Sequence, residues 1–296
     1  MYCFLVRKKK TAVVTGGAGF IGSHLCERLV RDGYKVISLD NYFAGSKNNH
    51  VKGVVYRRGH TKHIEKHIRE KPDVIYHLGE YSRVAASLEE PDVVWDLNMD
   101  GTFSVLEFWR KNKCKLVYAG SSTKNVGPRE DGVVGRDLAP YTWGKAVNTE
   151  LVVNYGRWYE LSYSIVYFYN VYGPRERPIW EYGTVIESFK QKYLEQKPLE
   201  VRSPGTQTRC FTHVDDTVEG IILVAEKGNG DEYGIASNCI FSLLEVAKMF
   251  GGKTKMLPPT KTTRSESVVD TVKIKSLGWK PVHTLKKYIE DIKNKK

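Results

Sequence analysis

The stretch TGGAGFIGSHL, residues 15–25, constrains this chain most, because it joins a β-branched apolar run to an amphipathic helical pattern through spaced glycines. Residues 11–15 read as a buried strand, and Ile21, Leu25 and Leu29 recur on one face of a helix. The glycines therefore stand at a strand-to-helix turn, where unpaired N–H groups at the helix start face an anion. The stretch predicts a cradle for the phosphates of a dinucleotide.

Each glycine has a reason to be there. Gly16 permits a tight turn, Gly19 lets a pyrophosphate approach the backbone, and Gly22 lets the helix pack close to the strand. Gly17, Gly19 and Gly22 also satisfy the spacing G-x-G-x-x-G. Two glycine registers are therefore open, with the same chemistry in both.

An acidic residue follows at the position that such a turn requires. Asp40 ends the next predicted strand, residues 35–39, and lies 18 positions after Gly22. A carboxylate there accepts hydrogen bonds from an adenosine ribose and repels a 2′-phosphate. The pattern favours NAD over NADP.

Composition predicts an ordinary globular protein. The chain of 296 residues has room for one large domain or two moderate ones, and no apolar run approaches the roughly 20 residues of a membrane span. The N-terminal MYCFLVRKKK places apolar residues before basic ones, an order that does not suit a secretory signal. Five widely spaced cysteines without a C-x-x-C pair read as reduced thiols. We expect a cytoplasmic protein with no membrane partner.

The net charge of +12 has two possible explanations, a nucleic-acid-binding surface or a basic surface on an enzyme with phosphorylated substrates. The basic clusters at residues 7–10 and 286–296 lie at the two ends and lack the interleaved aromatics of a single-strand binder. The second explanation is favoured, and no nucleic acid partner is expected.

The remaining elements alternate between strand and helix. Strands are predicted at 53–57, 73–78, 115–119 and 163–168, and helices at 60–70, 93–111 and 141–158. The alternation predicts an α/β fold, a Rossmann doubly wound parallel sheet, over residues 1–169. Residues 170–296 are predicted to form a smaller, mainly substrate-binding domain, and parts of 209–240 could return to the first domain.

The strand ends carry candidate chemistry. Tyr141 and Lys145 are four apart at a helix start, so their side chains share a face. An adjacent ammonium and a positively charged nicotinamide would each favour the phenolate, which makes Tyr141 a candidate general acid/base. The alternative is a helix tyrosine beside a surface lysine. Ser121 and Ser122 follow a strand at the same sheet edge and could hold a substrate hydroxyl, or they are ordinary turn serines.

Taken together, the motifs resemble the extended short-chain dehydrogenase/reductases that epimerise or dehydrate nucleotide sugars. The similarity runs over almost the whole chain. The matching pieces, in order, are TGGAGFIGSHL, Asp40-Asn41, PDVIYHLG at 72–79, Asn98 with Gly101-Thr102, SST at 121–123, PYTWGK at 140–145, NVYGPRE at 170–176, RCFTHVDD at 209–216 and LGWKP at 277–281.

The resemblance implies roles for particular residues. Lys145 would bind the nicotinamide ribose and lower the pKa of Tyr141, Ser122 would hold the reacting sugar hydroxyl, and Tyr141 would take its proton. The implied cofactor site comprises Gly16, Gly19, Phe20, Ile21, Gly22, Asp40, Asn41, Leu78, Gly79, Asn98, Lys145 and Tyr167. The implied substrate contacts are Ser122, Thr123, Tyr141, Asn170 and Arg209, the last pairing with phosphates unless it forms only a surface salt bridge. A nucleotide-diphosphate sugar is the implied partner, and the family usually forms homodimers.

The chain also departs from the family pattern. Glu80 stands where a small residue is usual, and His60 replaces an aspartate that contacts adenine. In the 4,6-dehydratases the two residues after the active-site hydroxyl are wholly or partly acidic, whereas here they are Thr123 and Lys124. The missing carboxylates favour an NAD-dependent nucleotide-sugar 4-epimerase, which oxidises C4 transiently and returns the hydride to the opposite face.

Other interpretations remain open. Within the family the alternatives are a 4,6-dehydratase, a decarboxylase or a keto-sugar reductase, and outside it a non-catalytic nucleotide-binding protein. His60, His63 and His67 have helical spacing, but with basic residues between them a solvated helix face is favoured over a metal site, so no metal is expected. The aromatic residues of the long helix are expected in the core or at a dimer surface; they are Trp95, Phe103, Phe108 and Trp109.

Overall fold

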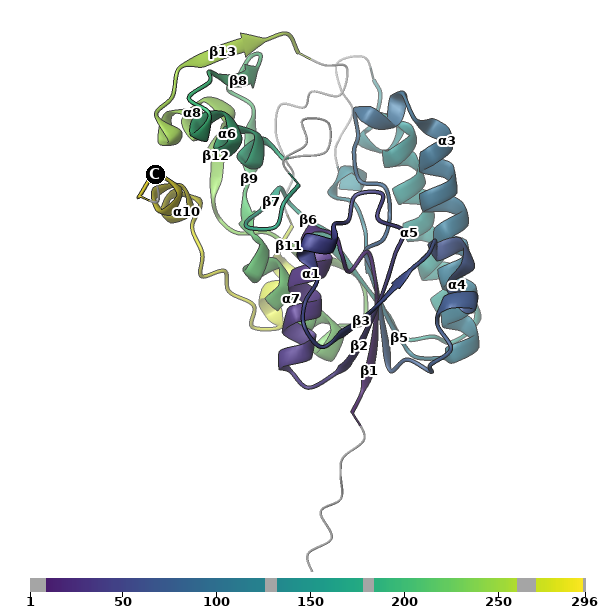
Figure 1. Ribbon diagram of the computed structural model, residues 1–296. Helices are drawn as coiled ribbons and strands as arrows, with labels where there is room; N and C mark the ends of the chain where they lie inside the picture. The colour runs from purple at the N-terminus through teal and green to yellow at the C-terminus, as the bar shows by residue number, and fades with distance from the viewer. Residues whose placement is uncertain (1–8, 126–131, 178–183, 260–269, 295–296) are drawn as a thin grey trace, which may run out of the picture.

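A computed structural model describes residues 9–125, 132–177, 184–259 and 270–294 (Figure 1). Its centre is a seven-stranded sheet in the order β3-β2-β1-β4-β5-β6-β11. All pairings within it are parallel. The carboxyl ends of the strands therefore share one edge, where a doubly wound fold places its ligands. The strands are β1 (Thr11–Thr15), β2 (Lys35–Asp40), β3 (Val54–Arg58), β4 (Val74–His77), β5 (Lys115–Ala119), β6 (Tyr163–Phe168) and β11 (Gly230–Ile235).

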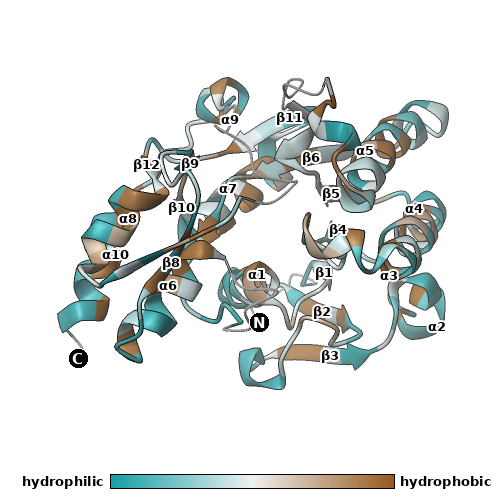
Figure 2. Cartoon of the chain, turned by 90° about the horizontal axis from the view of Figure 1, so that it is seen from above, coloured by the Kyte–Doolittle hydropathy of each residue, from teal (hydrophilic) through white to brown (hydrophobic). Residues whose placement is uncertain are grey.

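Helices cover both faces of the sheet, as the alternating sequence pattern predicts. Successive β1 residues point to opposite faces. Val14 therefore packs beneath α1 (Phe20–Arg31) and α7 (Val214–Lys227), whereas Val13 packs beneath α4 (Gly101–Asn112) and α5 (Pro140–Trp158). Figure 2 shows these two helical layers on either side of the sheet. The fold is a Rossmann doubly wound sheet.

The predicted helix at 93–111 contains an irregularity. It consists of α3 (Pro91–Val94), a π-helical stretch η4 (Trp95–Asp100) and α4 (Gly101–Asn112). Such π turns often occur at functional sites. Here the turn carries Asn98, whose buried amide bonds both the N–H and the carbonyl of Tyr81 beside the cavity.

The helix predicted at 60–70 is shorter than expected. Only η2 (Thr61–His63) and α2 (Ile64–His67) are helical, and Ile68 is extended and buried. The Arg57 guanidinium donates to the carbonyl of His67 and makes two hydrogen bonds to the Glu70 carboxylate. These contacts bind the last carbonyl of the helix, that of His67, where the chain leaves the helix toward β4.

A separate apolar cluster lies under the C-terminal part of the chain, which Figure 1 shows beyond the carboxyl edge of the sheet. It is built from α6 (Val185–Leu194), β8 (Leu199–Arg202), α8 (Leu243–Phe250) and α10 (Leu285–Asn294), and β13 (Thr254–Leu257) pairs with β8. The remaining elements are the long helix α5 (Pro140–Trp158), the parallel pair β7 (Val171–Tyr172) and β10 (Thr212–His213), the antiparallel pair β9 (Thr208–Cys210) and β12 (Ile240–Ser242), α9 (Val272–Ser276), and the short turns η1 (Lys47–Asn49), η3 (Ala86–Leu88), η5 (Ser122–Asn125) and η6 (Gly135–Asp137).

Segments distant in sequence complete the main sheet. β11 pairs with β6 at the edge, α9 packs on β11, and α7 packs on α1 and on the sheet.

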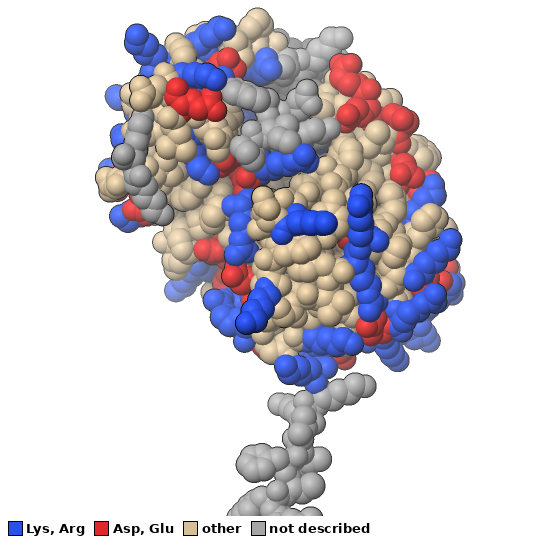
Figure 3. All heavy atoms as spheres, viewed as in Figure 1, with Lys and Arg blue, Asp and Glu red and all other residues tan. Residues whose placement is uncertain are grey.

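Among the described residues, no helix combines the length and the apolar character needed to cross a membrane. On the face drawn in Figure 3, Lys and Arg side chains are scattered among uncharged surface and gather most densely along the lower edge.

Candidate active site

A cavity of about 690 Å³ opens at the carboxyl edge of the sheet. Its wall includes the glycine turn, the ends of β2, β4 and β5, and the first turn of α5. The fold thus joins the predicted phosphate cradle and the predicted reactive residues in one space. Of the predicted site residues, the cavity is lined by Gly16, Gly19, Phe20, Ile21, Gly22, Asp40, Asn41, Leu78, Gly79, Ser122, Thr123, Tyr141, Lys145 and Asn170.

The turn between β1 and α1 can be made only with glycines. Gly16 has a φ of +74°, and a Cβ there would lie 2.9 Å from the Cα of Gly79. A Cβ on Gly22 would lie 2.1 Å from the carbonyl oxygen of Gly16. Gly17 does not line the cavity and is instead packed against Ser38 and Cys26. The register of Gly16, Gly19 and Gly22 is therefore the one that faces the cavity.

Asp40 lies at the end of β2 with its carboxylate held by backbone. Ala18 and Tyr42 donate their N–H groups to it over 2.9 and 2.8 Å. Burial raises the pKa of Asp40 and these two hydrogen bonds oppose the rise. The carboxylate is oriented beside the glycine turn, where a ribose hydroxyl of a dinucleotide would meet it.

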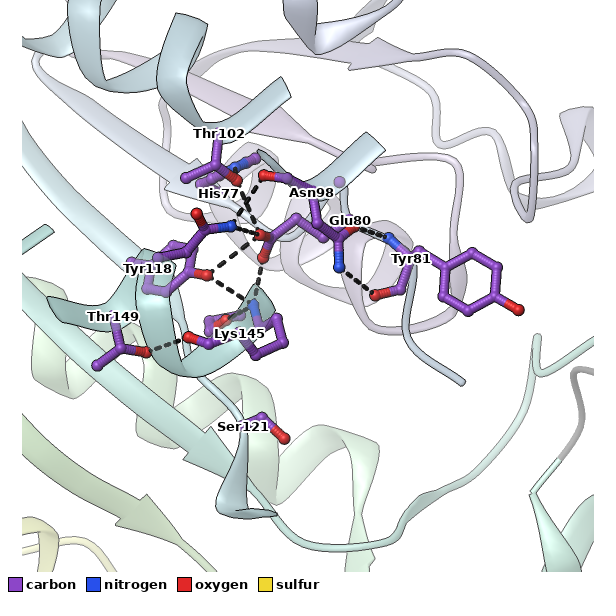
Figure 4. A network of polar contacts seen from close by, with 12 residues as sticks. His77, Glu80, Tyr81, Asn98, Thr102, Tyr118, Ser121, Lys145 and Thr149 are labelled. Carbon is purple, nitrogen blue, oxygen red and sulfur yellow. Dashed lines mark hydrogen bonds and ion pairs between the residues drawn. The ribbon is translucent and has the colours of Figure 1, made fainter. Parts of the chain in front are cut away.

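Glu80, a few residues after the end of β4 at His77, lies at the centre of a buried polar network (Figure 4). One carboxylate oxygen accepts hydrogen bonds from Thr102 (2.8 Å), Tyr118 (3.1 Å) and Asn148 (3.1 Å). The other accepts from the Lys145 ammonium. Both charged side chains are 4% exposed, so this is a buried ion pair.

Lys145 uses its donors within the protein. Besides Glu80, it donates to the Tyr118 hydroxyl over 3.0 Å and to the carbonyl of Ala119. Its nitrogen also lies 4.3 Å from the centre of the Tyr118 ring. Burial lowers the pKa of Lys145, and the charge and hydrogen bond of Glu80 act against that shift.

The directions of the hydrogen bonds around Glu80 follow from its carboxylate, which only accepts. Thr102 donates its single hydroxyl proton to Glu80, so its oxygen accepts from Nε2 of His77. Nδ1 of the neutral imidazole then accepts from the hydroxyl of Thr15 over 2.7 Å, and that hydroxyl accepts from the N–H of Gly79. Burial lowers the pKa of His77 to about 4, which keeps the imidazole neutral in this chain of bonds.

The candidate reactive residues line the same cavity. Tyr141 lies in the first turn of α5, one turn before Lys145, and lines the cavity with Ser122. Ser121 and Thr123 are buried and share a 2.8 Å hydrogen bond, while Ser122 between them is half-buried. The side chain of Lys124 lies outside the described residues.

Three predicted site residues do not line the cavity. Asn98 is fully buried against Tyr81, and Tyr167 is buried with its hydroxyl donating to Asp231 over 2.6 Å. Arg209 donates to the carbonyl of Thr208 and lies on β9.

Several charged residues of the wall were not predicted from the sequence. Arg83, Arg175, Glu176 and Arg177 line the cavity. Burial raises the pKa of Glu176 to about 7, while the N–H and hydroxyl of Thr184 donate to it. Three of the four lie in or next to the motif NVYGPRE, which could have drawn attention to them.

Among the described residues, one group of side chains brings possible metal-ligand atoms together. These are His213, Asp215 and His283, whose nitrogen and carboxylate oxygen atoms lie within 4.8 Å of one another. The rings of His213 and His283 stack at 4.3 Å with only 23° between their planes. Nearly parallel rings do not direct their in-plane lone pairs at one point, so the geometry does not favour a shared metal. His60 lies elsewhere, with Nε2 3.0 Å from Asp96, and it does not line the cavity.

The fold, the glycine turn and Asp40 together define a dinucleotide-binding enzyme of the Rossmann class. The chain belongs to the NAD dependent epimerase/dehydratase family, whose model matches residues 12–236. Its cofactor is accordingly NAD, and Gly16, Gly19, Gly22 and Asp40 of the cavity wall would hold it.

Relatives carry several activities. The chain is 32% identical to a putative UDP-glucose 4-epimerase of Methanocaldococcus jannaschii, over 95% of this chain and 97% of that protein. It is 33% identical to a UDP-N-acetyl-alpha-D-glucosaminuronate decarboxylase of Bacillus cytotoxicus, over 81% of this chain and 79% of that one. The structure of a UDP-glucose 4-epimerase from Thermotoga maritima with UDP-glucose superimposes with a TM-score of 0.87 at 27% identity, over 96% and 99% of the two chains. The chain is thus an enzyme of a family that modifies nucleotide sugars.

Proposed function

We propose that this protein is an NAD-dependent nucleotide-sugar 4-epimerase. The observation that carries the proposal is that Ser122, Tyr141 and Lys145 line the same cavity as the glycine turn, while Thr123 stands where a dehydratase has an acid. We assign cofactor binding to the cavity-facing members of the predicted set, and substrate binding to the C-terminal part with Asn170. Asn98, Tyr167 and Arg209 are left out of the contact set because they do not line the cavity.

The protein's own residues have distinct tasks in this reaction. Tyr141 as a phenolate takes the proton of the sugar 4-hydroxyl and later returns it, and Ser122 orients that hydroxyl by a hydrogen bond. Lys145 supplies positive charge one helical turn away, which favours the phenolate. NAD, when bound, supplies reversible acceptance of a hydride.

Replacing Tyr141 with Phe tests the catalytic assignment. Turnover should fall by about 10² to 10⁴-fold, while NAD still binds, because only the proton-transfer group is lost. Tyr159→Phe, at the exposed end of α5, is the matched control and should retain activity. Turnover by the Tyr141 variant at the wild-type rate would contradict the assignment.

A panel of UDP-, GDP- and dTDP-linked hexoses followed by NMR distinguishes the activities. An epimerase interconverts the C4 epimers without net use of NAD. Formation of only 4-keto-6-deoxy products would identify a dehydratase, and stoichiometric oxidation of added NADH would identify a reductase. Failure of every hexose of the panel and of a nucleotide-linked uronic acid to react, with NAD bound, would leave a non-catalytic nucleotide-binding protein.

A decarboxylase is the second candidate. The decarboxylase relative favours it, and Arg83 and Arg177 in the cavity wall could pair with a sugar carboxylate. Release of CO₂ from a nucleotide-linked uronic acid, with no change in neutral hexoses, would support this activity over epimerisation.

We also propose that the protein is a homodimer. Trp95, Phe103 and Trp143 are exposed large side chains on η4, α4 and α5, and the rings of Trp95 and Trp143 stack at 6.4 Å. Light scattering of the purified protein should give twice the chain mass, and Trp143→Glu should shift it toward one chain mass. A wild-type monomer at working concentration would refute the dimer.

We propose a cytoplasmic location as well, because the buried free thiols Cys26 and Cys210 fit a reducing compartment.

A further inference from the structure

Glu80 is a buried carboxylate at a position where the resemblance leads us to expect a small side chain. Four side chains donate hydrogen bonds to it. The carboxylate accepts in all four bonds, so it makes them without carrying a proton of its own. Burial by itself would raise the pKa of Glu80, but the charge of Lys145 and the donated hydrogen bonds hold it below its usual value. Glu80 is therefore ionised at neutral pH.

Lys145 depends on that charge. Of its three hydrogen-bond acceptors, the Tyr118 hydroxyl and the Ala119 carbonyl are neutral, and Glu80 carries the negative charge. A lysine buried without a counter-ion loses its proton, because transfer of an unpaired ammonium out of water is very unfavourable. With only neutral acceptors, Lys145 would become an amine.

The other titratable groups around the pair do not replace the carboxylate. His77 on β4 is neutral because burial lowers its pKa to about 4. Tyr118 on β5 is also neutral, because burial and the Glu80 charge hold its pKa well above the usual value. Tyr141, one turn earlier on α5, is the proposed general base, and Arg83 and Glu176 are further titratable residues of the same cavity wall.

We propose that Glu80 is a positioning residue whose carboxylate holds Lys145 as an ammonium ion on the cavity wall, one helical turn from Tyr141. This inference rests on the proposed role of Lys145 beside Tyr141. It gives the departure from the family pattern a physical purpose, because the charge is in place before cofactor or substrate binds. Preorganised charge needs no rearrangement when the reaction begins.

Glu80→Gln is the direct test, since it retains the shape of the side chain and removes its charge. The readout is the titration midpoint of Lys145 in the cofactor-free protein, followed by the ¹³C shift of its Cε and assigned by loss of the signal in Lys145→Arg. We expect the midpoint to fall by about one pH unit or more. Because the ammonium exists below its pKa, the basic limb of kcat/KM should move to lower pH by a similar amount.

Thr102→Val is the matched control, because it removes one hydrogen bond to Glu80 without removing charge. Its Lys145 midpoint should stay at the wild-type value even if the protein is less stable. An unchanged midpoint in Glu80→Gln, or an equal shift in Thr102→Val, overturns the proposal. If Glu80→Gln does not fold, Glu80→Asp replaces it, and the longer distance from carboxylate to ammonium should lower the midpoint by a smaller amount; no fall would again overturn the proposal.

The two proposals can fail separately. The titration requires no substrate and no turnover, so a shifted midpoint in a protein that epimerises nothing would refute only the proposed function. A competent epimerase whose Lys145 titrates identically in wild type and Glu80→Gln would refute only the role of Glu80.

Discussion

Asp40 and Glu80 are two buried carboxylates on the wall of one cavity, and they are held in opposite ways. Asp40 accepts from two backbone N–H groups, and burial raises its pKa. Glu80 accepts from four side chains, one of them cationic, and its pKa is lowered despite burial. Asp40 is held by backbone N–H groups, whereas Glu80 is held by side chains that include the charged Lys145.

The difference separates the two ends of the site. The donors to Asp40 come from the glycine turn, 22 positions earlier, and from two positions further along the chain, so one strand-turn-helix-strand unit suffices to orient it. The donors to Glu80 come from α4, β5 and α5, which only the complete fold brings together. The cofactor end of the site, at Asp40 and the glycine turn, is built from neighbouring elements. The reaction end, at Glu80 and Lys145, depends on packing between distant elements.

Lys145→Met should give the largest effect, because it leaves Glu80 buried without its counter-ion. We expect a loss of about 3–5 kcal/mol in the free energy of unfolding, measured by urea denaturation at neutral pH. The double variant Glu80→Leu with Lys145→Met should recover much of the loss, since it removes both charges. If the single variant were as stable as wild type, the ion pair would not hold the reaction end together.

Asp40→Ala should give an intermediate effect at the cofactor end. It leaves the N–H groups of Ala18 and Tyr42 without their acceptor, at a cost of about 1–3 kcal/mol, and it removes the ribose acceptor. Calorimetry should show weaker binding of NAD by roughly tenfold or more. Asp40→Asn retains an acceptor oxygen and should fall between Asp40→Ala and wild type; equal NAD affinity in all three would remove Asp40 from the site.

The smallest effect is in the pH dependence of stability. As pH rises, the contribution of Glu80 to the free energy of unfolding should increase and that of Asp40 should decrease. Glu80, with a lowered pKa, stabilises the fold above its unfolded pKa, and this contribution is lost as pH falls through the folded value. Asp40, with a raised pKa, favours the fold at low pH and loses that contribution as pH rises through the folded value. A difference of one pH unit between the folded and unfolded pKa of either group corresponds to about 1.4 kcal/mol of stability.

Urea titrations from about pH 3 to 7 can separate these two contributions. The stability difference between wild type and Glu80→Gln should grow with pH, and that between wild type and Asp40→Asn should shift in favour of the variant as pH rises. Slopes of the same sign would show that the two sites do not differ as their contacts indicate.

The sequence predicted the central fold well because its signals are local. Strands β1, β5 and β6 have the predicted limits, and α5 begins within one residue of its predicted start. The tight clash of a Cβ at Gly22 with Gly16 explains why a short glycine pattern is so informative. The predicted helix at 60–70 is too long because Arg57, on β3, donates a hydrogen bond to the carbonyl of His67, where the helix ends.

The sequence marks Glu80 only as a departure from the family pattern, without a role. Nothing near residue 80 in the chain indicates that Lys145, 65 positions later, will be its partner. The π turn at η4 was equally hidden, because a helix with one extra residue in a turn has nearly the same apolar pattern as a regular one.

The sequence by itself determined the strand-turn-helix cradle, the acid at the end of β2 and the helical pairing of Tyr141 with Lys145, since each depends on residues within one helical turn or within one strand-turn-helix-strand unit. The tertiary structure decided which of these face one cavity, and it joined Glu80 to Lys145. The physical reason is that a buried charge acquires its state from whatever the fold packs against it, and those partners come from strands and helices that are distant in the chain.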